Sequence, residues 1–332
     1  MDKILSISVA AYNVANYLDQ LMQSVIASGV IDDLEVLVVN DGSKDETASK
    51  ALEYQDLYPQ SVRLIDKENG GHGSTINRGI VEATGKYFRA LDGDDWIHSE
   101  HLRKLVAKMK NIESDIILSN YCKCFEDGRE ELGHDFDKLE DNHEYSFEEI
   151  TEKVDWMRYH TVIYKTTILK EHQIHLDEHC FYVDAEFMIL PIPYVKTVYY
   201  SEDYIYCYRL GLTEQSVSPE SRMKHVDNSL TVARRLIDFW RDIKATLSEP
   251  HKKYIESGII GHCMWHINSI YMFPLNAGKK NDLIQFDKYL KANAPDLYQL
   301  IGEKSKVLTA LRLSGYCLYP VARKYRNTKM SR

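Results

Sequence analysis

Short apolar segments alternate with helix-like stretches over residues 4–120, and this alternation constrains the fold more than any other feature of the chain. The strand-like segments are residues 5–11, 34–39, 62–65, 87–91 and 116–120. Segment 34–39 is apolar almost throughout, as in a parallel strand covered on both faces, and the stretches between segments carry apolar residues at helical spacing. The alternation predicts an α/β fold with a doubly wound, mostly parallel, Rossmann-like sheet.

Segment 87–91 runs into an acidic turn, Asp92-Gly93-Asp94-Asp95. Carboxylates this close together repel one another and raise each other's pKa, which a folded protein usually tolerates only beside a cation. Mg²⁺ and Mn²⁺ prefer oxygen ligands of this kind. An acidic turn that caps the following helix is the simpler alternative. The turn follows a buried strand, where open α/β sheets bind their ligands, and this position favours a metal site.

Composition excludes several classes of protein. The 332 residues are 44% hydrophobic, enough for a substantial core, and the formal net charge of -9 argues against a nucleic-acid partner. The six cysteines lack zinc spacing and indicate the reduced thiols of a cytoplasmic protein. The first residues do not resemble a signal peptide, and no apolar window is long enough to span a bilayer.

The pattern changes in the second half of the chain. Residues 122–145 are charged and irregular, and two further strands are expected at 195–200 and 204–209. From residue 221 onward the apolar spacing predicts helices. We therefore expect two domains, an α/β domain of residues 1–220 and a helical region of residues 221–332 with a basic end.

The helical region ends in a basic tail. No acidic residue follows Glu303, and leucines and tyrosines lie among the basic residues. The basic residues are Lys304, Lys306, Arg312, Arg323, Lys324, Arg326, Lys329 and Arg332. Such a segment can lie on an anionic membrane surface or form a docked helix with a solvated end, and the sequence leaves both readings open.

Several short motifs occur in a recognisable order. They are Ala11-Tyr12-Asn13, Val38-Val39-Asn40-Asp41-Gly42-Ser43, Asn69-Gly70-Gly71, Asn77-Arg78-Gly79, Asp92-Gly93-Asp94-Asp95, the aromatic and acidic block around Asp184, and Tyr208-Arg209-Leu210-Gly211 with Gln215-Ser216-Val217-Ser218. Over residues 4–220 the chain resembles family 2 glycosyltransferases, and the two aspartate-containing turns together carry most of that resemblance. The resemblance implies a GT-A fold, a nucleotide-sugar donor, a divalent Mn²⁺ or Mg²⁺ ion, and inversion at the anomeric carbon. It also implies that residues 1–220 form the nucleotide-sugar-binding and catalytic domain.

The resemblance also implies roles for particular residues in donor binding. Asp41 would accept a hydrogen bond from the base of the nucleotide, in a pocket lined by Ala11 and Tyr12. Asp92 would bind the ribose or uridine side of the donor, and Asp94 would ligate the metal. Further candidates for donor binding are Asn13, Asn69, His72 and Asn77, and weaker candidates for contacts with the acceptor or the diphosphate are Arg209 and Gln215.

Asp184 stands where the family usually carries its general base. A sugar hydroxyl is a weak nucleophile unless a carboxylate removes its proton, and a metal ion stabilises the charge on the leaving diphosphate. The family's usual Glu-Asp pair reads Val183-Asp184 here, and Glu186 follows, so Asp184 and Glu186 both stay candidates, with Asp184 favoured by the motif. His262 and His266 have metal-pair spacing but no acidic partner nearby, and we expect them on a helix face.

We therefore expect a metal-dependent, inverting hexosyl- or N-acetylhexosaminyltransferase. Its donor would be a nucleotide sugar, with UDP the favoured nucleotide, and its acceptor a glycan or lipid-linked glycan of a bacterial surface polysaccharide. We expect it in the cytoplasm, at the inner face of the membrane if the tail binds lipid. The alternatives are a nucleotidyltransferase, which would normally show a glycine-rich basic loop after the first strand, and an inactive glycan-binding protein of the same fold. The sequence leaves the oligomeric state open.

Overall fold

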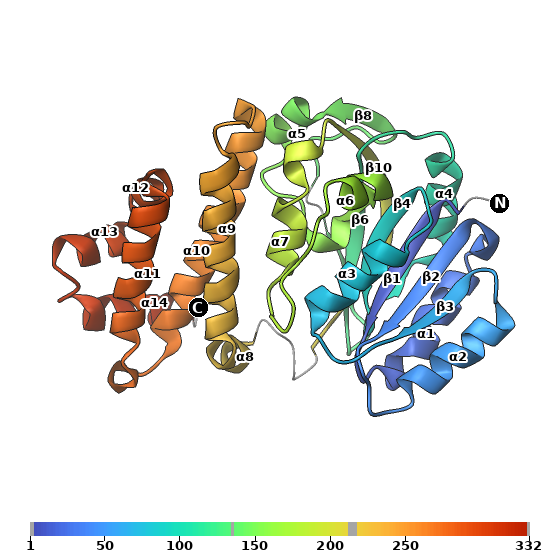
Figure 1. The fold of residues 1–332 in the computed structure, drawn as a ribbon, viewed down its shortest axis with the longest axis horizontal. Helices are drawn as coiled ribbons and strands as arrows, with labels where there is room; N and C mark the ends of the chain where they lie inside the picture. Colours follow the sequence, from blue (N-terminus) through green and yellow to red (C-terminus); the bar gives the residue numbers. More distant parts are fainter. Residues whose placement is uncertain (1–2, 134–135, 212–217, 331–332) are drawn as a thin grey trace. The chain divides into compact units, whose positions relative to one another are not determined.

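The computed structural model describes residues 3–133, 136–211 and 218–330 of the chain (Figure 1). The chain forms two compact units, Met1–Leu212 and Thr213–Arg332. We expected a division near residue 220. The roles that we assigned to the two parts remain predictions.

The first half of the sheet is the parallel arrangement that the alternation predicted. Its strands are β1 (Leu5–Ala11), β2 (Leu34–Asn40), β3 (Val62–Asp66) and β4 (Tyr87–Asp92). They lie side by side in the order β3-β2-β1-β4, with parallel pairing throughout. The carboxyl ends of these strands therefore meet at one edge of the sheet, and the loops that carry the predicted site residues begin there.

The second half of the sheet is mixed. The strands are β5 (Trp96–Ile97), β6 (Ile116–Phe125), β7 (Glu130–Leu132), β8 (His143–Ser146), β9 (Val162–Lys165) and β10 (Thr197–Leu210). Strand β9 lies antiparallel between β4 and β6, and β10 lies parallel to β6. The two strands expected at 195–209 are one strand, because β10 continues across two register shifts between Ser201 and Tyr206.

Helices cover both faces of this sheet. On one face, α1 (Ala15–Ile26), α2 (Thr47–Leu57) and α4 (Ser99–Met109) contribute side chains to the main apolar core. Contacts with the strands also come from α3 (His72–Glu82), α5 (Phe147–Lys153), α6 (Thr166–Glu171) and α7 (Asp184–Ile189). Helix α3 lies unusually close to β1, because a Cβ on Gly79 would come within 1.9 Å of Ser8 Oγ. Only glycine allows that approach.

Helix α1 begins at Ala15 without a hydrogen bond from a capping side chain. The N-cap is Val14, which has no side chain able to accept a hydrogen bond. The loop that leads into α2 replaces the missing cap: Val14 N–H donates to Thr47 Oγ1 at 2.9 Å, and Ala15 N–H donates to Asp45 Oδ2 at 3.1 Å. The loop after β1 is therefore held by the loop after β2.

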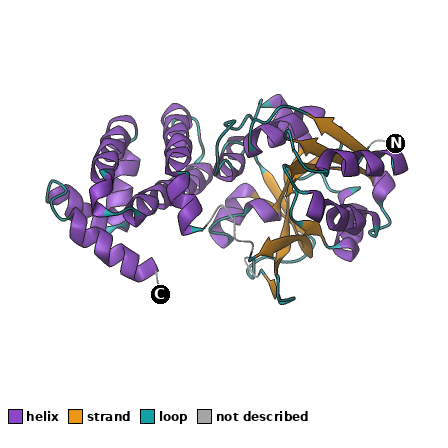
Figure 2. Ribbon diagram, turned by 90° about the horizontal axis from the view of Figure 1, so that it is seen from below, coloured by secondary structure: helices purple, strands orange, loops and turns teal. Residues whose placement is uncertain are grey.

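The described residues of the second unit form helices, as Figure 2 shows. They are α8 (Pro219–Lys224), α9 (Val226–Ile243), α10 (Glu249–Met272), α11 (Lys279–Asn293), α12 (Pro295–Lys304), α13 (Lys306–Leu313) and α14 (Tyr319–Met330). His262 and His266 lie buried on α10, where both contact Ser229 of α9. Among the described residues, no helix combines the length and apolar character needed to cross a bilayer.

Candidate active site

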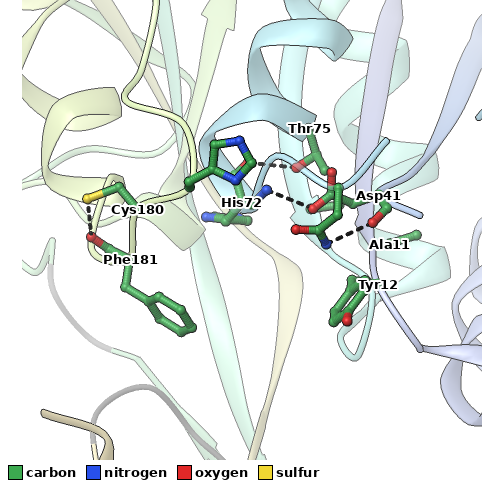
Figure 3. Close-up of a pocket in the computed structure, with 11 residues that line it drawn as sticks. Ala11, Tyr12, Asp41, His72, Thr75, Cys180 and Phe181 are labelled. Carbon is green, nitrogen blue, oxygen red and sulfur yellow. Dashed lines mark hydrogen bonds between the residues drawn. The ribbon is translucent and has the colours of Figure 1, made fainter. Parts of the chain in front are cut away.

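The loops at the carboxyl edge of the parallel strands enclose a cavity of about 380 Å³ (Figure 3). Its lining residues are Ala10, Ala11, Tyr12, Asp41, Asn69, Gly71, His72, Thr75, His179, Cys180 and Phe181. Figure 3 shows Cys180 and Phe181 on one side of His72, with Ala11, Tyr12 and Asp41 on the other. The volume is in the range of small-molecule sites, which run from about 300 to 1,000 Å³. The structure thus brings five of the predicted donor-binding residues to one cavity.

Asp41 is buried at the inner end of this cavity, with 2% of its surface exposed. Its Oδ1 atom accepts from Lys67 Nζ at 2.6 Å and from Gly70 N–H at 2.8 Å. Its Oδ2 atom accepts from Gly71 N–H at 2.8 Å. The carboxylate therefore fixes the glycine-rich loop as well as facing the cavity. Lys67, which neutralises Asp41, did not stand out in the sequence because it belongs to no motif.

The two predicted asparagines of these loops act on the backbone. Asn69 Nδ2 donates to the carbonyl oxygen of Asp41 at 2.9 Å. Asn13 adopts a left-handed conformation with φ of 54°, and its Oδ1 accepts from Lys44 N–H at 2.8 Å. Both residues therefore join loops that follow different strands, and this bonding sets the shape of the cavity.

The segment of residues 175–181 forms the opposite wall, and Asn77 of α3 holds it in place. Asn77 is 7% exposed; its Nδ2 donates to the carbonyl oxygen of Leu176 at 2.9 Å, and its Oδ1 accepts from Leu176 N–H at 2.8 Å. His179 N–H donates to the carbonyl oxygen of Gly70. Asn77 was predicted to bind the donor, but here both ends of its amide contact the protein.

The acidic turn lies beside the cavity, and His72 connects the two. His72 Nε2 lies 3.0 Å from Asp92 Oδ1, and Tyr159 Oη donates to the same oxygen at 3.3 Å. Asp95 is buried and accepts from Tyr206 Oη at 2.6 Å and from Arg209 N–H at 2.7 Å. Tyr159 and Tyr206 were not predicted, because strand and loop tyrosines are usually core residues.

Arg209 supports the acidic turn from β10. Its Nε donates to the carbonyl oxygen of Asp94 at 2.8 Å, and its guanidinium lies over the rings of Trp96 and Tyr17, at 4.7 and 4.9 Å. We considered Arg209 as a contact for the acceptor or diphosphate, and the structure places it behind the turn. Gln215, the other such candidate, lies outside the described residues.

The pKa values of the site depend on how closely His72 and the aspartates of the acidic turn lie together. Burial lowers the pKa of His72, but the hydrogen bond and negative charge of Asp92 outweigh burial, so the pKa of His72 is raised. Burial raises the pKa of Asp92, but the hydrogen bond and charge of His72, the charge of His160 and the hydrogen bond from Tyr159 together lower it. Burial and the neighbouring charge of Asp92 raise the pKa values of Asp94 and Asp95. A cation in this turn would relieve the repulsion.

A metal ion has several potential ligands here. Among the described residues, Asp92, Asp95 and His160 have donor atoms that all lie within 4.8 Å of one another. Asp94, the predicted ligand, adjoins this group in the chain. His160 belongs to the short 3-10 helix Tyr159–Thr161, and no sequence motif marks it because it lies far from the aspartates along the chain.

Asp184 and Glu186 differ sharply in their surroundings. Asp184 is the first residue of α7 and is exposed, whereas Glu186 has no exposed surface and accepts from Asp177 N–H at 2.8 Å. Enough protein surrounds Asp184 that desolvation raises the pKa of its carboxyl, although the nearby His72 opposes the shift. Only Asp184 of the two is open to a substrate.

Comparison with known proteins gives a consistent picture. The model of the family "Glycosyl transferase family 2" matches residues 6–172. "Putative glycosyltransferase EpsH" of Bacillus subtilis is 24% identical over 78% of this chain and 74% of its own length. "Glycosyltransferase GlyA" of Streptococcus pneumoniae is 31% identical over 36% of this chain, and the match spans only 17% of its length.

Solved structures share the fold. The crystal structure of S. aureus TarS 1-349 in complex with UDP-GlcNAc has a TM-score of 0.65 and 20% identity, covering 98% of this chain and 92% of that one. The mannosyltransferase PcManGT from Pyrobaculum calidifontis, in complex with GDP-Man and Mn²⁺, has a TM-score of 0.53 and 13% identity, covering 99% and 88%.

The expected GT-A fold and the expectation of an enzyme are therefore confirmed, and the nucleotidyltransferase and inactive-protein alternatives lose their support. The family match covers half of the chain and includes the acidic turn and the loops after β1, β2 and β3, but it ends before the cavity wall of residues 175–181. The chain belongs to glycosyltransferase family 2.

Proposed function

We propose that this glycosyltransferase is metal-dependent and inverting, and that it transfers a sugar from a UDP-sugar to a glycan or lipid-linked glycan. The observation that carries the proposal is the connection between the cavity and the acidic turn. His72 lines the cavity and also lies 3.0 Å from Asp92, so a nucleotide in the cavity would direct its diphosphate toward the turn.

Asp41 has one acceptor position left for a hydrogen bond from a nucleobase. A carboxylate oxygen accepts about two hydrogen bonds, and the structure gives Asp41 Oδ2 one donor, Gly71 N–H. This oxygen can therefore accept one bond from a nucleobase N–H. Uracil can donate its N3 proton to this oxygen, whereas cytosine would have to donate from its N4 amino group. Tyr12 is 49% exposed at the cavity, where its ring can pack against a base. The solved complexes of TarS with UDP-GlcNAc and UDP support a UDP donor.

The residues of the acidic turn fit a divalent ion. The raised pKa of Asp94 reflects burial and the charge of Asp92, and a cation would stabilise both carboxylates in their ionised form. We assign Asp94 as a ligand, with Asp92 or His160 able to contribute. A bound metal would stabilise the negative charge that develops on the leaving diphosphate. His72, with its raised pKa, can add a positive charge on the same side.

Asp184 is our assignment for the general base. It would take the proton of an acceptor hydroxyl while that oxygen bonds to the anomeric carbon and the bond from this carbon to the diphosphate breaks. Attack from the face opposite the diphosphate inverts the configuration. The exposure of Asp184, in contrast to Glu186, supports this role and leaves room for a large acceptor such as a glycan chain.

A chelation experiment tests the proposal. EDTA should abolish transfer from a UDP-sugar, and Mn²⁺ or Mg²⁺ should restore it. Asp94→Asn should lose activity, whereas the same change at exposed Asp56 on α2 should have no effect. Full activity in EDTA would disprove metal dependence. Equal binding of UDP, GDP and CDP would disprove the role of Asp41 in base recognition.

A further inference from the structure

The basic tail is docked, and three of its arginines are used inside the second unit. Arg312 Nε donates to Asp287 Oδ2 at 2.9 Å, and both side chains are largely buried. Arg323 donates to the carbonyl oxygen of Phe273, and Arg326 donates to Ser305 Oγ at 3.2 Å. These three cations therefore hold the tail to α10, α11 and the start of α13.

The docking leaves an opposite face of α14 in solvent. Tyr319, Ala322, Arg323 and Arg326 follow helical spacing on the inner side, where Tyr319 and Ala322 are buried. Val321, Lys324, Tyr325 and Thr328 have the same spacing on the outer side, and all four are exposed.

Several large apolar side chains on and next to this outer side are exposed to solvent. Val321 is 66% exposed and Tyr325 is 51% exposed. The last residue of α13, Leu313, is 85% exposed, and Leu318, in the turn before α14, is 45% exposed. We call these four residues the outer apolar face. A cluster of large apolar side chains in water usually marks a surface that meets a partner.

The charges of the segment that carries the outer apolar face identify the partner. Lys304, Lys306 and Lys324 are exposed, and the sequence contains no acidic residue after Glu303. The whole chain carries a formal charge of -9, so this cationic segment stands out against an acidic molecule. A symmetric pairing of two copies through this face would place lysines opposite lysines. Anionic lipid headgroups are the complementary surface.

We propose that the outer apolar face, together with the exposed lysines of the same C-terminal segment, docks the second unit onto an anionic lipid surface. Val321, Tyr325 and the two leucines would enter the interfacial layer, and the lysines would contact the headgroups. This partner goes beyond the proposed transfer reaction and does not depend on it. Because the three arginines bond inside the unit, the exposed lysines make the direct headgroup contacts, each adding roughly fivefold to the partition coefficient near an anionic surface.

Flotation of the full chain with vesicles tests the proposal. The protein should float with phosphatidylcholine vesicles that contain phosphatidylglycerol, less so at high salt, and not with phosphatidylcholine alone. Val321→Asp combined with Leu313→Asp should reduce binding at least about tenfold, because two apolar contacts become repelled charges. The matched control is Leu57→Asp, at a leucine 70% exposed on α2 of the first unit, and it should bind like the wild type.

Two further experiments measure the contribution of the lysine charges and the insertion of the apolar side chains separately. Lys324→Glu should weaken flotation, whereas Lys253→Glu, at an exposed lysine of α10, should change it less. All six cysteines are described, and only Cys317 is exposed, so an environment-sensitive dye can be attached there. Its emission should shift to the blue on anionic vesicles. Thermal melting checks that each variant is folded, and UDP-sugar hydrolysis should be unchanged.

Two results would overturn the proposal. One is that the folded wild type does not float with anionic vesicles even at low salt. The other is that light scattering shows a dimer, that Val321→Asp/Leu313→Asp converts this dimer to a monomer, and that the wild type and the double variant bind vesicles equally. The outer apolar face would then be a self-association surface.

Discussion

Asp41 combines a structural role with its proposed contact to the nucleotide. A residue on a loop would be expected to tolerate alanine without loss of stability. Asp41 is instead buried with Lys67 and two backbone N–H groups as partners. The sequence marked Asp41 through its motif, but it could not show this burial because the partners come from a separate loop.

The first prediction concerns that double role. Asp41→Ala should weaken UDP binding and also reduce the free energy of unfolding by about 3 kcal/mol, because the Lys67 ammonium and two N–H groups lose their acceptor. Chemical denaturation and calorimetric titration with UDP measure the two effects. Asp56→Ala, at an exposed aspartate of α2, is the control. Unchanged stability would show that the network around Asp41 contributes little.

The second prediction separates the two candidate bases. Asp184→Asn should lower kcat by about 10²-fold or more, with donor affinity nearly unchanged and normal thermal stability. Glu186→Gln should act mainly on the melting temperature, because Glu186 is buried and bonded to Asp177. Steady-state kinetics with a parallel melting curve distinguish them. An inactive but stable Glu186→Gln beside an active Asp184→Asn would reverse the assignment.

The third prediction is the pH dependence that follows from Asp184. A general base must be ionised, so kcat should fall as the pH drops through the pKa of Asp184. Desolvation raises that pKa, and the acid limb should therefore lie above the ordinary value of 3.8. A kcat profile across acidic pH measures it, and Asp184→Glu should move the limb. An acid limb unmoved by this change would assign it to another group.

At the scale of elements, α3 and the segment 175–181 act as one structure. Asn77 holds Leu176 at both backbone groups, and Gly73 leaves the space that Asp177 occupies. This segment carries His179, Cys180 and Phe181 to the cavity and leads into Asp184. The position of the proposed base therefore depends on how α3 packs against a distant part of the chain. Asn77 and Leu176, which are in contact, are 99 residues apart in the sequence.

The fourth prediction tests this dependence with two alanines. A Cβ on Gly73 would come within 2.1 Å of the carbonyl oxygen of Asp177, so Gly73→Ala should displace the segment, lower the melting temperature and raise the donor KM. Gly261 of α10 has no atom within 4 Å of such a Cβ. Gly261→Ala should therefore stabilise the protein by up to about 1 kcal/mol. Normal kinetics in Gly73→Ala would mean that the segment adjusts without effect on the site.

The elements themselves were largely predictable where contacts are local. The parallel strands β1 to β4 follow from apolar runs and helical spacing that the sequence shows directly. The antiparallel position of β9 between β4 and β6 could not be predicted, because strand pairing between distant segments leaves no local pattern. The same reason hid His160 and Tyr206, which reach the acidic turn from the 3-10 helix Tyr159–Thr161 and from β10.

At the scale of the whole molecule, donor and metal binding should appear in the unfolding transition. A ligand that binds only the folded state stabilises it by about 2.7 kcal/mol at 100 times its Kd. UDP and Mn²⁺ together should raise the melting temperature by more than the sum of their separate shifts, because each completes the site of the other. Asp94→Asn should leave only the separate UDP shift. Purely additive shifts in the wild type would indicate that UDP and metal bind independently.

The position of β10 has a consequence for how the protein is made. The family match ends at residue 172, but β6 pairs with β10, and Asp95 receives its bonds from Tyr206 and Arg209 on that strand. During translation β6 waits on the order of ten seconds for β10 to emerge. Throughout that interval one edge of β6 stays open to wrong partners, the situation that favours aggregation. A chain cut at residue 172 would keep the sequence signature of the family and yet remain in this exposed state permanently.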